Sequence, residues 1–181
     1  HPPFRTYRSL PYSLLVWVTF KSFLDRFITC FSIALCMKVL IVTGTPGSGK
    51  TTLAKQLAKK HNYVYIDVNA LILTNKLYEN YDKTLKTKIV DTKKLSAFLI
   101  KHVKTIKEQG VVIDSHLSHF LPASFVDVCY VTTCQLPKLK QRLKKRGYST
   151  LKIRDNLEAE AFQTCLIEAQ ELKHNVVVKS T

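Results

Sequence analysis

Hydrophobic and polar positions follow two different periods along most of the chain. Short apolar runs rich in β-branched residues, each closed by glycine or polar residues, predict buried strands at 38–43, 63–67, 111–114, 125–132 and 176–178. Apolar positions spaced by three or four predict helices at 50–60, 69–77, 92–109, from 137 to the glycine turn at 147, and from 150 to about 173. The lysine-rich stretch 78–90 is expected to be irregular.

Strands that alternate with helices of this length form parallel βαβ units. The fold class is therefore predicted to be α/β, with helices covering both faces of a parallel sheet. Asp91 or Thr92 is expected to cap the helix that follows, and Gly110 to end it.

The first 36 residues differ from the rest, because they hold three prolines and no glycine. Their apolar stretches, 14–20 and 27–36, are shorter than the roughly 20 residues that span a bilayer. Met37 is the only methionine of the chain. We expect translation to begin there and residues 1–36 to be a mis-assigned extension; a signal sequence, an interaction arm and a membrane anchor are the alternatives.

The chain of 181 residues carries a formal net charge of +15. Residues 1–36 hold four basic residues and one acidic residue, which leaves +12 for 37–181. Such a balance predicts attraction to polyanions such as nucleotides or RNA; the alternative is a chain that uses lysine on its solvated faces. Five cysteines without a CxxC pair indicate reduced thiols in a cytosolic protein.

The sequence GTPGSGKT follows the first predicted strand and opens a helix, which satisfies the phosphate-loop pattern GxxxxGK[ST]. Gly47 and Gly49 let backbone N–H groups approach phosphates. Lys50 supplies a positive charge to the β- and γ-phosphates, and Thr51 supplies a hydroxyl ligand for magnesium. Thr52 adds a hydroxyl for the α-phosphate. This motif predicts binding of ATP with Mg²⁺.

A second candidate site lies where the apolar run 111–114 ends in Asp114, the pattern of a Walker B strand. A carboxylate there holds magnesium, usually through water. His116 is placed to orient or deprotonate a nucleophile, or to contact a phosphate; the alternative is a loop histidine that bonds backbone. His119 is interpreted as a loop histidine of that kind.

A basic helix ends in a third candidate site. Arg142 and Arg146 are four positions apart on one helix face, and Arg154 begins the next helix. We expect Arg146, just before a glycine turn, to close over the transferring phosphoryl group and offset its charge. The lysines of the same helix are interpreted as solvated side chains, at positions 138, 140, 144 and 145.

These motifs together resemble the adenylate kinase isoenzyme 6 family over residues 37–181. The matching segments are GTPGSGKTT, DSH at 114–116, RLKKRGY at 142–148 and NLEAE at 156–160, and SHLSHFLP resembles the archaeal branch. The resemblance implies a three-layer sandwich with a five-stranded parallel sheet, that is, a P-loop NTPase of the nucleoside monophosphate kinase type. It also implies a monophosphate-binding segment at about 68–91 and a lid at about 145–155.

The resemblance implies a broad-specificity adenylate kinase that transfers phosphate from ATP to AMP or another nucleoside monophosphate, with ATPase activity tied to Asp114 and His116. It further implies a role in late maturation of the small ribosomal subunit, including pre-rRNA processing, with ribosomal protein uS11 and rRNA as partners, in the cytoplasm and away from membranes. Two alternatives remain: a P-loop kinase of another small metabolite, because 83–86 reads KTLK where relatives tend to be acidic, and an assembly ATPase without significant kinase activity. Relatives usually continue beyond Thr181, so the C-terminus is expected to be incomplete.

Overall fold

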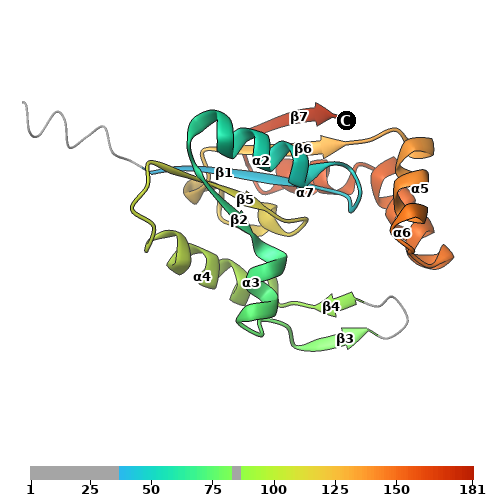
Figure 1. Cartoon of the computed structure of the whole chain (residues 1–181), viewed down its shortest axis with the longest axis horizontal. Coiled ribbons are helices and arrows are strands. Elements are labelled where there is room, and N and C mark those ends of the chain that lie inside the picture. The colour runs from blue at the N-terminus through green and yellow to red at the C-terminus, as the bar shows by residue number, and fades with distance from the viewer. Residues whose placement is uncertain (1–36, 83–86) are drawn as a thin grey trace, which may run out of the picture. The chain divides into compact units, whose positions relative to one another are not determined.

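The structure is a computed structural model, and it describes residues 37–82 and 87–181. Helices and strands alternate along these residues (Figure 1). In chain order they are β1 (Lys38–Gly44), α2 (Lys50–His61), β2 (Val64–Asp67), α3 (Val68–Thr74), β3 (Asn80–Asp82), β4 (Thr87–Ile89), α4 (Thr92–Val103), β5 (Gly110–Asp114), the 3₁₀ turns η1 (Ser118–Phe120) and η2 (Ala123–Phe125), β6 (Val128–Thr133), α5 (Leu136–Lys145), α6 (Thr150–Ala161), α7 (Thr164–Glu171) and β7 (Val176–Ser180).

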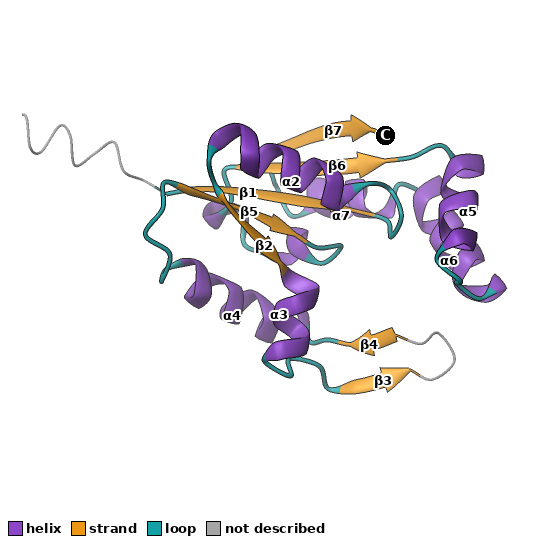
Figure 2. Cartoon of the chain, in the orientation of Figure 1, coloured by secondary structure: helices purple, strands orange, loops and turns teal. Residues whose placement is uncertain are grey.

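Five strands form one parallel sheet in the order β2-β5-β1-β6-β7. Helices lie on both of its faces (Figure 2). The predicted α/β class, the three layers and the five-stranded parallel sheet are therefore confirmed. In such a sheet, ligands bind beyond the carboxyl ends of the strands. In this chain the phosphate loop leaves β1 at that edge, and Asp114 ends β5 there.

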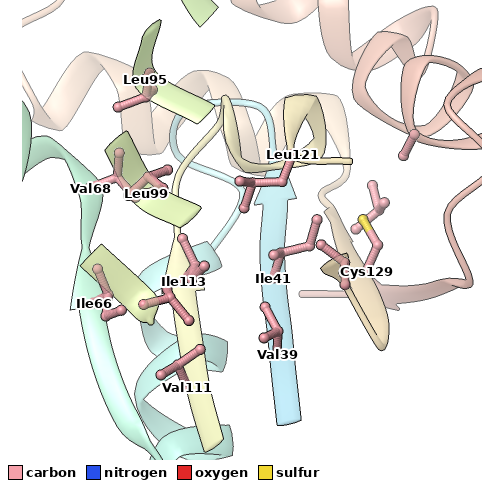
Figure 3. Packing of buried hydrophobic residues seen from close by; sticks show 14 of the residues in the cluster. Val39, Ile41, Ile66, Val68, Leu95, Leu99, Val111, Ile113, Leu121 and Cys129 are labelled. Carbon is pink, nitrogen blue, oxygen red and sulfur yellow. The ribbon is translucent and has the colours of Figure 1, made fainter. Parts of the chain in front are cut away.

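The alternation of side chains along β1 and β5 creates two separate cores. Val39 and Ile41 of β1 and Ile113 of β5 face α3, α4 and α7, as Figure 3 shows for the residues around Leu99. The intervening residues of both strands, Leu40, Val42 and Val112, pack under α2. Each fully buried aliphatic side chain contributes roughly 1.5–3 kcal/mol relative to exposure. The two cores hold the site-bearing edge rigidly.

Helix beginnings follow the polar residues that the sequence offers. The Asp91 carboxylate accepts hydrogen bonds from the amides of Lys93 and Lys94 at 2.8 and 3.1 Å, which starts α4 as predicted. Such a cap stabilises a helix by about 1 kcal/mol. Ser149 caps α6 in the same manner through the amide of Lys152.

Four predicted boundaries are wrong. The helix expected over 92–109 ends at Val103, because Thr105 turns its hydroxyl back to the carbonyl of His102 at 2.7 Å. The helix expected over 150–173 divides into α6 and α7 at Gln163, whose φ of 52° no α-helix accommodates. The helix expected over 69–77 runs from Val68 to Thr74. The strand expected over 125–132 begins at Val128, since a 3₁₀ turn precedes it.

The stretch 78–90 is not irregular throughout. The strands β3 and β4 pair antiparallel, with Tyr81 opposite Lys88, and extend from the sheet as a hairpin (Figure 1). The basic segment 83–86 lies outside the described residues, as do residues 1–36 and the expectations placed on both. No helix among the described residues has the length and apolar character needed to cross a membrane.

Candidate active site

The phosphate loop joins β1 to α2 in the conformation that its glycines permit. Gly47 and Gly49 have φ values of 92° and 99°, which favour residues without a Cβ. A Cβ on Gly47 would come within 3.0 Å of Leu139, so α5 packs directly against the outer side of the loop. Lys50 begins α2, and the amide-rich N-terminus of this helix faces the same space as the loop.

Lys50 crosses the loop, and its ammonium group donates to the carbonyls of Gly44 and Thr45 at 2.9 and 3.0 Å. Burial lowers the pKa of Lys50 to about 8, although the nearby charge of Asp114 opposes that shift. A polyanion arriving at this point favours the charged ammonium. The protein therefore holds the Lys50 ammonium in a buried position, where its electrostatic attraction to a bound phosphate group is strong.

Two oxygen ligands for a hard cation come together beside Lys50. Asp114 is 5% exposed at the end of β5, and its Oδ2 accepts a hydrogen bond of 2.9 Å from the hydroxyl of Tyr65. Thr51, in the first turn of α2, lines the same cleft as Asp114. Burial, followed by the bond to Asp114, raises the pKa of Tyr65, so the phenol stays protonated.

This donor set fits magnesium, which takes one or two protein oxygens together with substrate phosphates and water. Among the described residues there is no group of three or more His, Cys, Asp or Glu side chains that suits a metal held by protein alone. Thr51 and Asp114 are the residues that would hold Mg²⁺, with the phosphates of a bound nucleotide.

A cleft of about 370 Å³ opens over the phosphate loop. It brings together all the residues that the sequence analysis assigned to nucleotide, metal and catalysis. Its lining consists of Pro46, Gly47, Gly49, Lys50, Thr51, Thr52, Asn69, Thr87, Asp114, His116, Arg146, Tyr148 and Lys152. Asn69 and Thr87 come from the predicted monophosphate-binding segment, and the last three residues come from the predicted lid.

His116 stands at one wall of the cleft, two residues beyond Asp114. Desolvation of the ring by the surrounding protein, and then the charges of Lys50 and Lys152, lower the pKa of His116, although the residue as a whole is exposed to solvent. The imidazole is therefore neutral at pH 7, the form that accepts a proton. Its place and its charge state both suit a base that acts on water or on an acceptor hydroxyl.

The two arginines of α5 serve different sides of the phosphate loop. Arg146, at the end of the helix, lines the cleft. Arg142 lies on the outer side, where its Nη1 donates to the carbonyl of Gly47 at 3.2 Å. Arg154 contacts Asp155 and Glu158 and does not line the cleft.

A second cavity of about 350 Å³ adjoins the cleft, and both are lined by Pro46, Thr87, His116 and Lys152. Leu117 and Phe120 give it apolar walls. Its polar lining comes mainly from α6 and α7, through Asp155, Asn156, Thr164, Cys165 and Glu168. A molecule here meets a molecule in the cleft at His116 and Lys152.

Sequence reasoning missed Tyr65 and Lys152. Tyr65 sits in a short strand, where alternation alone predicts an aromatic packing residue. Lys152 looks like any lysine on a solvated helix, yet its ammonium lies 3.0 Å from the hydroxyl of Thr87 and 4.7 Å from the ring centre of Tyr148. The position of Lys152 one turn into the lid helix was the available signal.

His119 is buried and has side-chain partners, not the backbone partner that its loop position suggested. Its Nδ1 is 2.8 Å from the hydroxyl of Thr43, and its Nε2 lies 3.0 Å from Glu168 without the alignment of a hydrogen bond. Burial and the nearby His174 and His116 lower its pKa to about 4. A neutral His119 ties η1 to β1 beneath the loop.

Known proteins share this fold and these motifs. A family model described as an AAA domain matches residues 40–163. The adenylate kinase isoenzyme 6 homolog of Caenorhabditis elegans is 38% identical over 132 residues, which is 73% of this chain and 72% of that protein. A Methanosarcina barkeri protein, named provisionally as an adenylate kinase, is 36% identical over 72% of this chain and 69% of its own length. The shikimate kinase of Bacteroides thetaiotaomicron shares the fold, with a TM-score of 0.52 at 16% identity over 80% of this chain and 86% of that one.

Fold and relatives together define a P-loop phosphotransferase of the nucleoside monophosphate kinase type. The chain belongs to the AAA domain family and, more narrowly, to the adenylate kinase isoenzyme 6 family.

Proposed function

We propose that the protein transfers the γ-phosphate of ATP to AMP or another nucleoside monophosphate, with Mg²⁺ as cofactor. The observation that carries this proposal is the shared wall of the two cavities. ATP phosphates in the cleft would point toward His116 and Lys152, and an acceptor in the second cavity would meet them there. Such proximity converts a reaction between two bound molecules into an effectively unimolecular step.

The donor nucleotide uses the phosphate loop. The backbone N–H groups around Gly47 and Gly49, together with Lys50, bind its β- and γ-phosphates, and Thr52 reaches the α-phosphate. Thr51 and Asp114 are the residues that would hold the metal ion, and the ion would neutralise negative charge on the phosphates.

The acceptor occupies the second cavity. Leu117 and Phe120 provide the apolar surface that a nucleobase favours, while Asn156 and Glu168 provide partners for hydroxyl and amino groups. Its phosphate would lie toward Lys152, beside Thr87 of the hairpin. A volume of about 350 Å³ is large enough for a nucleoside monophosphate.

Arg146 and Lys152 stabilise the charge of the transferring phosphoryl group from the lid side. In phosphoryl transfer the protein contributes mainly positioning and electrostatic stabilisation, and little covalent chemistry. Arg146 lies close enough to Lys50 to lower the pKa of that lysine, and Lys152 lines the same cleft, so three cations surround the proposed position of the transferring group.

Hydrolysis of ATP follows from the same geometry when water takes the place of the acceptor. The neutral imidazole of His116 faces the cleft and accepts the proton of the attacking water. The ATPase activity is therefore expected to depend on Asp114 and His116 together.

The charge of the domain favours a second role in late maturation of the small ribosomal subunit, in the cytoplasm, with uS11 and rRNA as partners. Lysines of α2 and α5 are exposed on the surface, among them Lys59, Lys60, Lys138, Lys140 and Lys144. Exposed cations of this kind attract a nucleic-acid backbone. Release of ribosomal partners coupled to ATP turnover accounts for both the charge and the ATPase site.

The decisive assay follows ADP formation from ATP and Mg²⁺ by the full chain, alone and with AMP, CMP, UMP, GMP, shikimate or uS11. The proposal expects AMP, or another nucleoside monophosphate, to raise the rate at least about tenfold, and shikimate to leave it unchanged. A rate raised only by shikimate or another non-nucleotide refutes it in favour of a metabolite kinase. A rate raised only by uS11 refutes the kinase role and retains the assembly ATPase.

A further inference from the structure

The outer side of the phosphate loop is held by two residues that the proposed chemistry does not use. Nη1 of Arg142, on α5, donates to the carbonyl of Gly47 at 3.2 Å and to the hydroxyl of Thr181 at 3.1 Å. The hydroxyl of Thr181 in turn donates to the carbonyl of Ser48 at 2.6 Å. Two consecutive carbonyls of the loop thus point away from the cleft toward one connected pair of side chains.

The direction of these carbonyls fixes the direction of the amides. In a trans peptide the C=O and the next N–H point opposite ways. A carbonyl of Ser48 held outward therefore turns the amide of Gly49 inward, toward the cleft that Gly49 lines. Gly49 has a φ of 99°, in a region where glycine has great freedom, so this peptide needs an external constraint.

The surroundings of the pair make it a firm support. Thr181 continues β7, and its amide donates to the carbonyl of Thr133 at 2.9 Å. A Cβ on Gly49 would come within 3.1 Å of Thr181, so the loop already rests against that side chain. Arg142 also donates to Sγ of Cys134, just past the end of β6, at 3.4 Å.

We propose that Arg142 and Thr181 are positioning residues that preorganise the phosphate loop for a triphosphate from its outer side. The proposal rests on the proposed function only for its substrate, since it concerns binding of the donor phosphates and requires no acceptor. Arg142 thereby differs from Arg146, four residues on, which lines the cleft and faces the phosphates themselves.

The test compares affinities for inorganic tripolyphosphate with Mg²⁺ and for ATP with Mg²⁺, by calorimetry on the full chain. Tripolyphosphate has neither base nor sugar, so it reports on the loop alone. Thr181→Val removes one neutral donor and should weaken both ligands by about two- to tenfold, whereas Arg142→Met removes a charged donor and should weaken both by at least about tenfold. The double variant should lose less than the product of the two factors, because the residues share a bond.

Kinetics supply a second readout. Loss of preorganisation weakens the binding of ATP in the ground state and in the transition state equally. KM for ATP should therefore rise, while kcat at saturating ATP changes less than about twofold. Arg142→Lys, which retains a charged donor, should restore part of the affinity. Lys101→Met removes an exposed cation from α4, away from the phosphate loop, and should leave both affinities unchanged.

Unchanged tripolyphosphate affinity in Thr181→Val and Arg142→Met would overturn the proposal. If the affinity for ATP fell while that for tripolyphosphate did not, Arg142 would act on the base or the sugar of ATP instead. If the unfolding temperature alone fell, the pair would serve stability only. Thr181→Val deletes one hydroxyl and keeps the backbone bond to Thr133, so it carries the test should Arg142→Met fail to fold. A parent chain that binds tripolyphosphate but transfers no phosphate refutes the proposed function without touching this inference.

Discussion

The phenol of Tyr65 donates a hydrogen bond of 2.9 Å to Oδ2 of Asp114. A hydroxyl from β2 therefore fixes the carboxylate that ends β5, one of the two residues proposed to hold magnesium. The other of the two, Thr51, lines the same cleft as Asp114.

Tyr65→Phe should weaken magnesium binding without unfolding the protein. The substitution removes the hydrogen bond from the phenol to the Asp114 carboxylate. It should weaken magnesium binding only indirectly, because Asp114 is then held less firmly in position. We expect the Mg²⁺ concentration for half-maximal activity to rise about three- to tenfold, with the rate at saturating Mg²⁺ nearly unchanged. Tyr63→Phe, one residue before the same strand, is the matched control. An unaltered Mg²⁺ dependence in Tyr65→Phe would remove Tyr65 from the metal site.

The low pKa of Lys50, about 8, predicts a loss of ATP capture in mild alkali. Only the protonated amine attracts phosphate, so kcat/KM for ATP should fall as pH rises through about 8. An ordinary lysine would lose its charge only above pH 10. Bound triphosphate raises the pKa again, so kcat at saturating ATP should stay level to higher pH.

A pH profile of kcat/KM between 7 and 10 measures this effect. A level profile across that range would show that Lys50 keeps its full charge in the unliganded protein. Lys50→Ala should reduce both transfer and hydrolysis by at least about a hundredfold, since each depends on the same phosphate contact.

His116→Ala should separate the two activities. The imidazole acts as a base for water, so hydrolysis should fall about a hundredfold, while transfer to AMP should fall less than about tenfold. In one assay, phosphate release measures hydrolysis, and the ADP formed in excess of that phosphate measures transfer. His61→Ala, on the exposed end of α2, serves as the control. Equal losses of both activities would argue for a role of His116 in phosphate binding instead.

Lys152→Met should reduce the rate of phosphoryl transfer more than it reduces the affinity for ATP. Lys152 lies at the junction of the two cavities, beside Thr87. The transferring phosphoryl group would carry its negative charge through this point in the transition state. We expect kcat for transfer to fall about ten- to a hundredfold with little change in KM for ATP. Arg154→Met removes a cation from the same helix outside the cleft and should change neither kcat nor KM for ATP appreciably. A higher KM for ATP with unchanged kcat would place Lys152 on the donor instead.

The phosphate loop and Asp114 could be predicted because their requirements are local. Glycines, a lysine and a threonine at fixed spacing between a strand and a helix determine the loop, and an apolar strand that ends in Asp114 determines the second site. Parallel strand order then brings the two together, since Val42 of β1 stands opposite Asp114. Periodicity likewise predicted the sheet and most helices.

Tyr65, Lys152 and Thr181 could not be found in this manner. Tyr65 contacts Asp114, Lys152 contacts Thr87 and Thr181 contacts Ser48. These contacts arise from tertiary packing, which no spacing in the sequence predicts. The break at Gln163 was missed for a similar reason. Apolar spacing continues across it, and only packing of α7 under the sheet, with Ala169 fully buried, requires the turn.

The fate of labelled phosphate tests directly whether a phosphoryl group passes from the cleft to the second cavity. The full chain is incubated with ATP labelled at the γ-phosphate, Mg²⁺ and AMP, and the products are separated. If the group passes to the acceptor, label should appear mainly in newly formed ADP, and in inorganic phosphate once AMP is omitted. Label confined to inorganic phosphate, at the same rate with and without any nucleoside monophosphate, would contradict it.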